Sequence, residues 1–319
     1  MYHVILDTDV GIDDALALFL ALSSPEIELE AITTVNGNVP VEVGTRNVLA
    51  LLELAGRTDI PVARGCDRPL VRPAIDAKHI HGDNGLGNAV LAEPHITPVA
   101  QHAVDLLSER IMAKPHKITL VCIGPLTNVA LALRREPRIA DAIYEVVIMG
   151  GALRVHGNVT PAAEYNIYAD PHAAHIVLHG GWPIRLVSLD VTTVTLLKPE
   201  QIANLPDNPV TELIKYMTDY SFRFSAALDN AHGFPMHDPL CVGAVLQSDL
   251  IAWQPAYVDV ELADSVTLGA TVAQFDAHNR PHGLHSNVHA SVGVEAGQFV
   301  QLFLERCKFY NKMLDLEQK

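Results

Sequence analysis

The sequence predicts a single α/β domain with a mainly parallel central sheet flanked by helices, in the manner of a Rossmann-like open sheet. Short apolar, β-branched runs alternate with helical patterns up to about residue 190, and no change in composition marks a linker. Strand–helix–strand units repeated in this way build parallel sheets with right-handed crossovers. Alternating patterns near the end of the chain add a small antiparallel extension. We therefore expect one domain over residues 1–319.

Strands are expected where short apolar runs are bounded by turn residues, at 4–6, 29–35, 60–63, 118–123, 145–149 and 184–189. Helical spacing of apolar residues predicts helices at 15–22, 43–54, 99–112, 129–134 and about 171–178. Residues 64–94 have little periodicity but contain several histidines and glycines. This stretch is expected to be either a mobile lid or an ordinary surface loop.

The last third of the chain predicts mainly helix over 199–236, with a helix start near Pro209 and a buried helix over 240–246. Strands follow at 256–262, 267–275 and 287–294, before a final helix from 296 to about 310. His237 is expected just outside the helix at 240–246, where an aspartate before proline, as at Asp238, is ordinary capping chemistry.

Composition and charge limit the possible partners. With 319 residues, of which 49% are hydrophobic, the chain can bury a large core. Its formal charge of −15 argues against binding to nucleic acid. The four cysteines lack C-x-x-C spacing, no apolar run is long enough to span a membrane, and the chain opens directly in a strand pattern. We expect a soluble cytoplasmic protein with reduced thiols that acts on a small molecule and contacts neither nucleic acid nor membrane.

Carboxylates are concentrated at the end of the first predicted strand, where four aspartates fall within residues 7–14. The carboxyl ends of parallel strands form the crevice in which open α/β sheets bind ligands. The helix dipole tolerates Asp13 and Asp14 in a first helical turn, but carboxylates that share one crevice repel each other unless a cation lies among them. Because neighbouring helical residues point about 100° apart, we expect one of this pair to face a metal ion and the other a substrate.

The polar residues at predicted strand ends are rich in oxygen donors. They are Asp7, Asp9, Asp13, Asp14, Asn38, Asn158, Glu164, Asn166, His237 and Asp238. Oxygen ligands select calcium or magnesium over zinc, and many loosely arranged ligands favour calcium. Carboxylates and amides also suit a polyhydroxylated substrate. No Walker loop, nucleophile elbow or dinucleotide fingerprint follows a predicted strand.

Seven segments, in order along nearly the whole chain, resemble the nucleoside hydrolases of the inosine-uridine preferring type. They are Asp-Thr-Asp-Val-Gly-Ile-Asp-Asp at 7–14, Thr-Thr-Val-Asn-Gly-Asn at 33–38, His-Gly-Asp-Asn-Gly at 81–85, Ile-Gly-Pro-Leu-Thr-Asn at 123–128, Met-Gly-Gly at 149–151, Ala-Glu-Tyr-Asn at 163–166 and His-Asp-Pro at 237–239. The resemblance implies hydrolysis of the N-glycosidic bond of a ribonucleoside (inosine, uridine or cytidine) to ribose and nucleobase. It also implies one bound Ca²⁺ and a homodimer or homotetramer.

The resemblance also implies roles for individual residues. The calcium ligands would be Asp9, Asp14, the backbone carbonyl of Ile123, and Asp238. The ribose would be held by Asp13, Asn38, Met149, Asn158, Glu164 and Asn166, with His81 on the suspected lid contacting the base. Asp9 would be the general base that activates a metal-bound water, and His237 the acid for the departing base, because histidine titrates near neutral pH.

Two departures from the family pattern stand out. Val10 occupies the position where proline is usual, a change expected to be harmless because proline mainly restricts the turn. Ser221 and Ser225 lie where some members place tyrosines near the leaving base. Two other readings remain open: a haloacid-dehalogenase-like phosphatase that uses Asp7 and Asp9, and a calcium-dependent nucleoside or sugar binding protein without catalysis.

Overall fold

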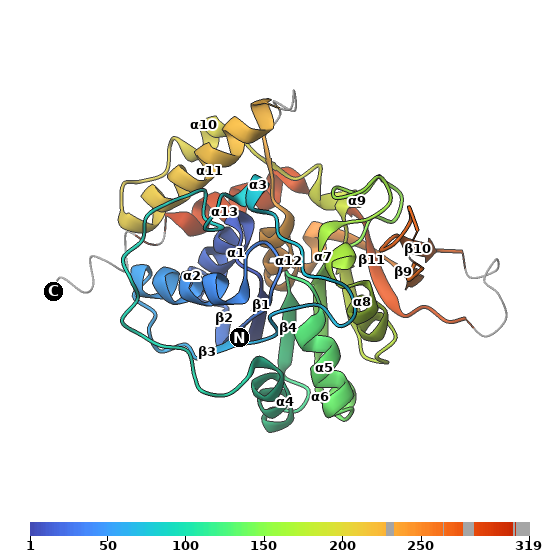
Figure 1. The fold of residues 1–319 in the computed structure, drawn as a ribbon. Helices are drawn as coiled ribbons and strands as arrows, with labels where there is room; N and C mark the ends of the chain where they lie inside the picture. Colours follow the sequence, from blue (N-terminus) through green and yellow to red (C-terminus); the bar gives the residue numbers. More distant parts are fainter. Residues whose placement is uncertain (228–232, 264, 277–283, 309, 311–319) are drawn as a thin grey trace.

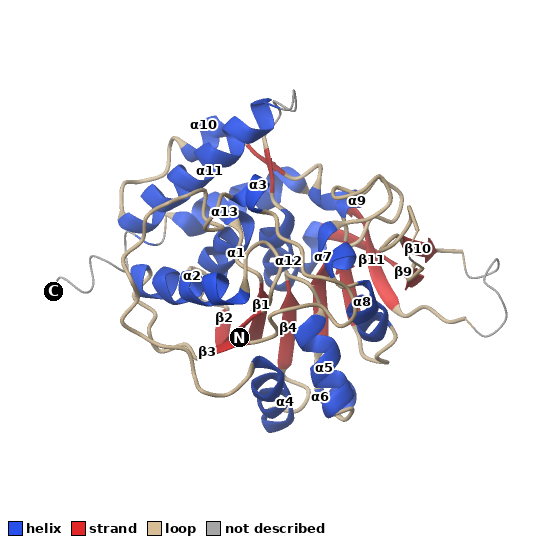
Figure 2. Ribbon diagram, in the orientation of Figure 1, coloured by secondary structure: helices blue, strands red, loops and turns tan. Residues whose placement is uncertain are grey.

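The computed structural model describes the chain except for residues 228–232, 264, 277–283, 309 and 311–319. The described residues form a nine-stranded sheet with helices on both faces and a separate two-stranded ribbon (Figures 1 and 2). The sheet strands are β1 (Tyr2–Thr8), β2 (Ile27–Thr34), β3 (Val62–Arg64), β4 (Ile118–Cys122), β5 (Glu145–Met149), β6 (Ile184–Val187), β9 (Ile251–Val260), β10 (Thr271–Gln274) and β11 (Val288–Val294). The ribbon pairs β7 (Leu196–Leu197) with β8 (Phe234–Pro235).

The helices alternate with these strands along the chain (Figure 2). They are α1 (Ile12–Leu22), α2 (Val41–Leu54), α3 (Lys78–His81), α4 (Ala103–Ala113), α5 (Thr127–Arg135), α6 (Ile139–Ala142), α7 (Tyr165–Ala169), α8 (Pro171–Leu178), α9 (Leu189–Thr192), α10 (Pro199–Ile202), α11 (Pro209–Ala227), α12 (His237–Leu246) and α13 (Ala296–Cys307), with a 3-10 turn at Ser248–Leu250. None of the helices in the described part of the chain is both long and apolar enough to cross a bilayer.

The strand order explains where a site can form. Along the sheet the order is β10-β9-β11-β6-β5-β4-β1-β2-β3, and the seven strands from β11 to β3 run parallel to their neighbours. The chain adds β2 and β3 on one side of β1 and then crosses to add β4, β5 and β6 on the other. β1 and β4 therefore flank the topological switch point, where open α/β sheets form a ligand crevice at the carboxyl ends of the strands. The predicted fold class is confirmed.

The core lies on both faces of this sheet. On β1, Val4 and Leu6 point into a cluster with α1, α2, α12 and α13, whereas Ile5 points into a second cluster with α4, α5 and α8. A strand covered on both faces reads as a continuous apolar run, which is the pattern that identified it in the sequence. Every residue of α1 is buried, so the turn between β1 and α1 is held by rigid elements on each side.

Several predicted boundaries are corrected. The helix expected from residue 99 begins at Ala103, because Val99 instead forms a bridge with Ala63 beside β3. His237 is the first residue of α12 and does not precede the helix, and Asp238 is not its cap: the cap is Met236, without a side-chain hydrogen bond. The antiparallel extension is formed by β9 and β10, but β11 joins β6 in parallel, so the extension belongs to the main sheet.

Candidate active site

A cavity of about 370 Å³ lies where the carboxyl ends of β1, β4 and β5 meet. All seven candidate substrate contacts line it, namely Asp13, Asn38, His81, Met149, Asn158, Glu164 and Asn166. Ile123, His237 and Asp238 also line the cavity. Asp9 and Asp14 do not, since both are buried in the turn between β1 and α1. The structure thus gathers segments that are up to 225 residues apart in the sequence around one hollow.

Asp14 organises the turn that leads from β1 into α1. Its carboxylate accepts hydrogen bonds from the backbone N–H groups of Gly11 (2.7 Å) and Asp9 (3.3 Å). It also accepts from the Thr8 hydroxyl and from the Asn38 side-chain amide (3.1 Å). These donors and the positive end of the helix dipole disperse the charge of a carboxylate that is 1% exposed.

Val10 has a left-handed backbone, with a φ of 47°. This conformation is unusual for any residue with a side chain and more so for a β-branched one. A proline ring holds φ near −65°, so proline cannot adopt this turn. The turn at Val10 therefore differs from any that a proline allows, and the expectation that the replacement is harmless stays a prediction.

Asp9 lies in a tight space between two loops. Its Oδ2 accepts a hydrogen bond from the backbone N–H of Asn38 (2.7 Å). A Cβ at Gly37 would lie 2.0 Å from the same oxygen, and a Cβ at Gly124 would lie 3.0 Å from Oδ1, so both glycines are needed for this close approach. The Oδ1 atom is buried and has no hydrogen-bond partner among the described residues. One oxygen of Asp9 is held in place while the other is left unpaired.

Three buried aspartates form an acidic cluster beside the cavity. Asp13, Asp14 and Asp238 each offer a carboxylate oxygen within 4.8 Å of the others, and Asp9 lies outside this group of three. Burial, reinforced by the charge of Asp14, raises the pKa of Asp13 from 3.8 to about 8. Burial and the neighbouring aspartates also raise the pKa values of Asp9 and Asp238.

The donor chemistry of this cluster fits a hard divalent cation. The acidic cluster contains only oxygen donors, and among the described residues the buried Oδ1 atoms of Asp9 and Asp13 have no hydrogen-bond partner, although Nδ1 of His81 lies 3.8 Å from Oδ1 of Asp13. Buried carboxylates in such numbers are costly unless a positive charge compensates them. The cluster is therefore a possible acidic metal site. Within the pair, Asp14 is enclosed by hydrogen-bond donors, whereas Asp13 borders the cavity. The division of the pair between metal ion and substrate stays a prediction, since both belong to the acidic cluster.

Glu164 stands at the start of α7 and faces the cavity with its carboxylate held in place. Its oxygens accept hydrogen bonds from the backbone N–H groups of Asn166 (2.8 Å), Gly151 (3.0 Å) and Ile167 (3.1 Å). Burial raises its pKa although these donors act in the opposite direction. Asn158 supports the same corner, since its side-chain oxygen accepts from the backbone N–H of the residue after Glu164.

Asn166 connects the ends of β4 and β5. Its amide nitrogen donates to the carbonyl oxygens of Ile123 (3.0 Å) and Met149 (3.3 Å). The sequence placed Asn166 after a predicted strand, and in the structure it belongs to the short helix α7. A helix end fixes the side chain more firmly than a loop does, so the two carbonyl oxygens have a defined position at the cavity.

Two histidines border the cavity as neutral imidazoles. The Nδ1 atom of His81 accepts a hydrogen bond from the backbone N–H of Ile12 (3.1 Å), and burial lowers the pKa of His81 to about 4. The Nδ1 atom of His237 lies 2.7 Å from the Thr192 hydroxyl, and burial together with His81 lowers its pKa to about 4. The premise that His237 titrates near neutral pH is therefore wrong, because it ignored burial.

Sequence reasoning missed some of the cavity lining. Tyr165 lines the cavity with a buried hydroxyl that has no partner among the described residues, and burial raises its pKa. Its place between Glu164 and Asn166 was the available signal. Phe234 also lines the cavity, and no periodic pattern identified it. Ser221 lines the cavity too, but its hydroxyl donates to a backbone carbonyl 3.4 Å away; the side chain of Ser225 lies outside the described residues.

Comparison with known proteins agrees with this geometry. Residues 4–301 match the family model described as inosine-uridine preferring nucleoside hydrolase. The chain is 41% identical over 302 residues to the inosine-uridine preferring nucleoside hydrolase of Crithidia fasciculata, and the alignment covers 92% of this chain and 93% of that protein. It is 40% identical over 314 residues to the pyrimidine-specific ribonucleoside hydrolase RihA of Salmonella typhi, and the alignment covers 96% of this chain and 98% of that protein. Among solved structures, the purine-preferring ribonucleoside hydrolase of Gardnerella vaginalis matches with a TM-score of 0.90 and 33% sequence identity. The match covers 98% of this chain and 99% of that chain.

Proposed function

This chain belongs to the family of inosine-uridine preferring nucleoside hydrolases and is an enzyme that hydrolyses the N-glycosidic bond of ribonucleosides, and we propose that it does so with a bound Ca²⁺ and with Asp9 as the general base. The observation that carries the proposal is the concentration of buried carboxylates beside the cavity, with unpaired oxygens on Asp9 and Asp13. A site of this kind is unfavourable in an empty protein and suits a cation and a sugar.

The proposed ligands of Ca²⁺ are Asp9, Asp14, the carbonyl oxygen of Ile123, and Asp238. All are oxygen donors, and Asp14 and Asp238 belong to the acidic cluster. When bound, the ion would orient the ribose hydroxyls and lower the pKa of a nearby water molecule. The absence of sulfur and nitrogen donors in the acidic cluster favours calcium or magnesium over zinc.

The proposed sugar-binding residues are those that line the cavity with carboxylates and amides, together with one thioether: Asp13, Asn38, Met149, Asn158, Glu164 and Asn166. Carboxylate and amide oxygens accept hydrogen bonds from sugar hydroxyls, and the amide nitrogens of Asn38 and Asn158 can donate to them. Departure of the base leaves positive charge on the ribose ring, which nearby carboxylates stabilise. Glu164 is already held rigidly by three backbone N–H groups, so it needs little reorganisation during the reaction.

Asp9 is proposed to accept the proton of the attacking water. Its Oδ2 is held by the N–H of Asn38, which leaves Oδ1 as the free oxygen. Burial and the charge of Asp14 raise the pKa of Asp9 in the metal-free protein, and a cation bound beside it would keep the carboxylate ionised, so that it can accept a proton. Asp7, two residues earlier, also has one oxygen held, because its Oδ1 accepts hydrogen bonds from Thr33 and Asn128, and its buried Oδ2 has no partner among the described residues. The choice of Asp9 over Asp7 therefore rests on the family resemblance.

His81 and His237 are proposed to contact the leaving base. The Thr192 hydroxyl occupies Nδ1 of His237, so Nε2 is the ring nitrogen available to the base. When Nδ1 accepts from the Thr192 hydroxyl, Nε2 carries the ring hydrogen, and the uncharged ring would act by donating a hydrogen bond from Nε2 to the departing base. The named relatives differ in their stated preference between purines and pyrimidines. We propose inosine, uridine and cytidine as substrates.

The phosphatase alternative finds no support at this site. The match of residues 4–301 is to the nucleoside hydrolase family, and Oδ1 of Asp7, which would be the phosphatase nucleophile, already accepts hydrogen bonds from Thr33 and Asn128. The binding-protein alternative is separated from the enzyme by turnover alone.

The test is release of reducing sugar from inosine, uridine, cytidine and adenosine, each assayed with Ca²⁺ and after exhaustive chelation. Calcium-dependent ribose release supports the proposal and ranks the bases. Release that survives chelation would refute the role of the ion, and absence of release with every nucleoside would favour the binding protein. Asp9→Asn should abolish release, whereas Asp7→Asn, the same change two residues earlier on β1, serves as the matched control.

We also propose a cytoplasmic location and assembly as a homodimer or homotetramer. All four cysteines are free thiols, which suits a reducing compartment. Sedimentation of the purified protein tests the assembly, and a monomer at micromolar concentration would refute it.

A further inference from the structure

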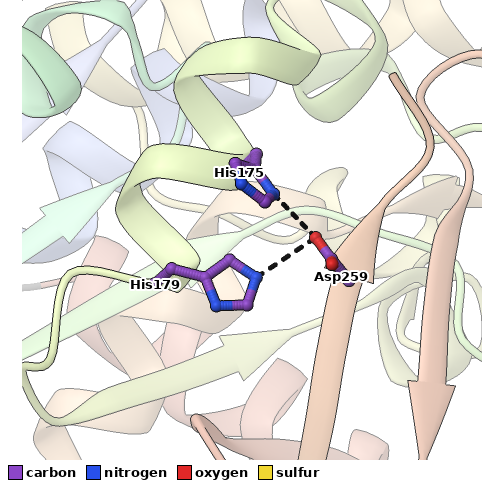
Figure 3. Close-up of side chains that lie close together, drawn as sticks. All are labelled: His175, His179 and Asp259. Atoms are coloured by element: carbon purple, nitrogen blue, oxygen red, sulfur yellow. Dashed lines mark hydrogen bonds and ion pairs between the residues drawn. The ribbon is translucent and has the colours of Figure 1, made fainter. Parts of the chain in front are cut away.

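A second group of metal-binding side chains lies outside the cavity, between α8 and β9 (Figure 3). His175 is on α8, and His179 is the residue that ends this helix; Asp259 is on β9. Nδ1 of His175 is 2.7 Å and Nε2 of His179 is 3.1 Å from Oδ1 of Asp259. Both imidazoles therefore point at one carboxylate oxygen from the same side.

The backbone that carries these side chains is held in register. The side-chain amide nitrogen of Asn287 donates to the carbonyl oxygens of Leu178 (3.1 Å) and Val258 (2.8 Å), which directly precede His179 and Asp259. The hydroxyl of Tyr257 lies 3.2 Å from Oδ2 of Asp259 and orients the carboxylate. A ligand set on rigid elements, with a hydrogen-bonded carboxylate, is preorganised for metal binding.

We propose that His175, His179 and Asp259 form a binding site for a divalent transition metal ion of the zinc class. Histidines four residues apart lie on one side of a helix, and two imidazoles with one carboxylate are a common ligand set for Zn²⁺. The three donor atoms lie within 4.8 Å of one another. A water molecule would complete a tetrahedral site.

Exposure makes this site accessible to an ion from solution. The side chains of His175, His179 and Asp259 are 40%, 32% and 35% exposed. Its nitrogen donors also separate it from the acidic cluster at the cavity, since imidazole favours zinc, whereas carboxylates alone favour calcium or magnesium. The two sites would therefore select different ions.

A comparison within the chain supports the choice of this group. His3, Glu28 and Glu30 also come together, but Lys114 pairs with Glu30 and supplies the positive charge itself. No lysine or arginine pairs with Asp259 in the part of the chain that the structure describes. Apart from hydrogen bonds from the backbone N–H of Val260 (2.8 Å, to Oδ1) and the Tyr257 hydroxyl, the side chains that pair with the carboxylate of Asp259 in the described part of the chain are the two imidazoles, which can become metal ligands.

The experiment is a titration of chelator-treated, dialysed full-length protein with Co²⁺ in excess Ca²⁺, followed by visible absorption, with Zn²⁺ as the competitor. We expect one equivalent of Co²⁺ to give the intense visible bands of tetrahedral coordination and Zn²⁺ to displace it. Zn²⁺ should also raise the melting temperature by several degrees, because it binds the folded state.

Substitutions identify the ligands. His179→Gln and Asp259→Asn should each weaken Co²⁺ binding at least tenfold and remove the thermal shift, while His3→Gln, a histidine in the competing group, should leave both unchanged. Nucleoside hydrolysis in Ca²⁺ is expected to be equal in all four proteins. Absence of a one-equivalent tetrahedral spectrum in the wild-type protein, or the same spectrum in the folded His179→Gln and Asp259→Asn proteins, would overturn the proposal.

Discussion

Removal of metal should make the stability of this protein fall as pH rises through neutrality. In the metal-free protein burial raises the pKa of Asp13 from 3.8 to about 8, and the pKa values of Asp9 and Asp238 are raised as well. Above about pH 5 the unfolded chain has released these protons, whereas the folded chain still holds them. Because the folded state binds more protons than the unfolded state, the free energy of unfolding decreases with pH in this window.

The size of the effect follows from the shift at Asp13. One group that is protonated only in the folded state changes the free energy of unfolding by about 1.4 kcal/mol per pH unit. From pH 6 to pH 8, where Asp13 is half titrated, this amounts to roughly 2–3 kcal/mol from that residue alone. Asp9, Asp238 and Asp7, whose pKa burial raises to about 7, act in the same direction, whereas His81 and His237, whose pKa values burial lowers to about 4, act in the opposite direction below about pH 7. With Ca²⁺ bound, the carboxylates beside the ion would be ionised in the folded state, so the share of the pH dependence that comes from Asp9, Asp13 and Asp238 should disappear.

Urea unfolding at pH 6, 7 and 8, in chelator and in excess Ca²⁺, measures this difference. Asp13→Asn removes the titrating group and its charge, so the chelated variant should lose about one group's share of the slope and exceed the chelated wild type in stability at pH 8. A free energy of unfolding that is constant from pH 6 to pH 8 in chelator would refute the reasoning. An unchanged slope in Asp13→Asn would refute the assignment to that residue.

Three further predictions concern single side chains of the cavity. Asp9→Asn should lower kcat by about 10²–10⁴-fold, measured as ribose release, with Asp7→Asn retaining most turnover; near-normal turnover in Asp9→Asn would remove it as the base. His237→Ala should slow natural nucleosides far more than p-nitrophenyl riboside, without altering the pH profile of kcat/KM between 6 and 8, because the pKa of His237 is about 4; equal losses on both substrates would argue against proton donation. Tyr165→Phe removes a buried unpaired hydroxyl and should raise the free energy of unfolding by about 1 kcal/mol or more, and a loss of stability in denaturant titration would contradict this.

The sequence predicted the elements well where local pattern determines structure. The strand at residues 145–149 and the helix at 171–178 have the bounds that the apolar runs indicated. The order of strands in the sheet was not predicted, because it depends on pairing between segments far apart in the chain. That β4 lies beside β1, so that the backbone N–H of Ile123 donates to the carbonyl oxygen of Asp7 (2.9 Å), is a consequence of this long-range pairing.

The sequence predicted which residues line the cavity, but it did not predict their pKa values. Residues such as Glu164 and Asn166 stand out in the sequence as polar groups after a strand, and the cavity brings them together. The protonation of His237 could not be inferred in the same way. Its pKa depends on how completely the fold excludes water from the imidazole and on the distance to His81, and neither quantity is encoded in residue type or spacing.

The turn between β1 and α1 shows how the fold separates aspartates that look equivalent in the sequence. Asp14 accepts four hydrogen bonds, which fix the turn and disperse its charge. Asp13, the adjacent residue, keeps an unpaired Oδ1 at the cavity, and Asp9 keeps another beneath it. Between Asp9 and Asp13 the backbone passes through the left-handed conformation of Val10, and the three carboxylates have these different surroundings on either side of it. The strain at Val10 and the unpaired oxygens therefore belong to one arrangement, in which the folded protein keeps acidic groups uncompensated where a cation and a sugar can bind.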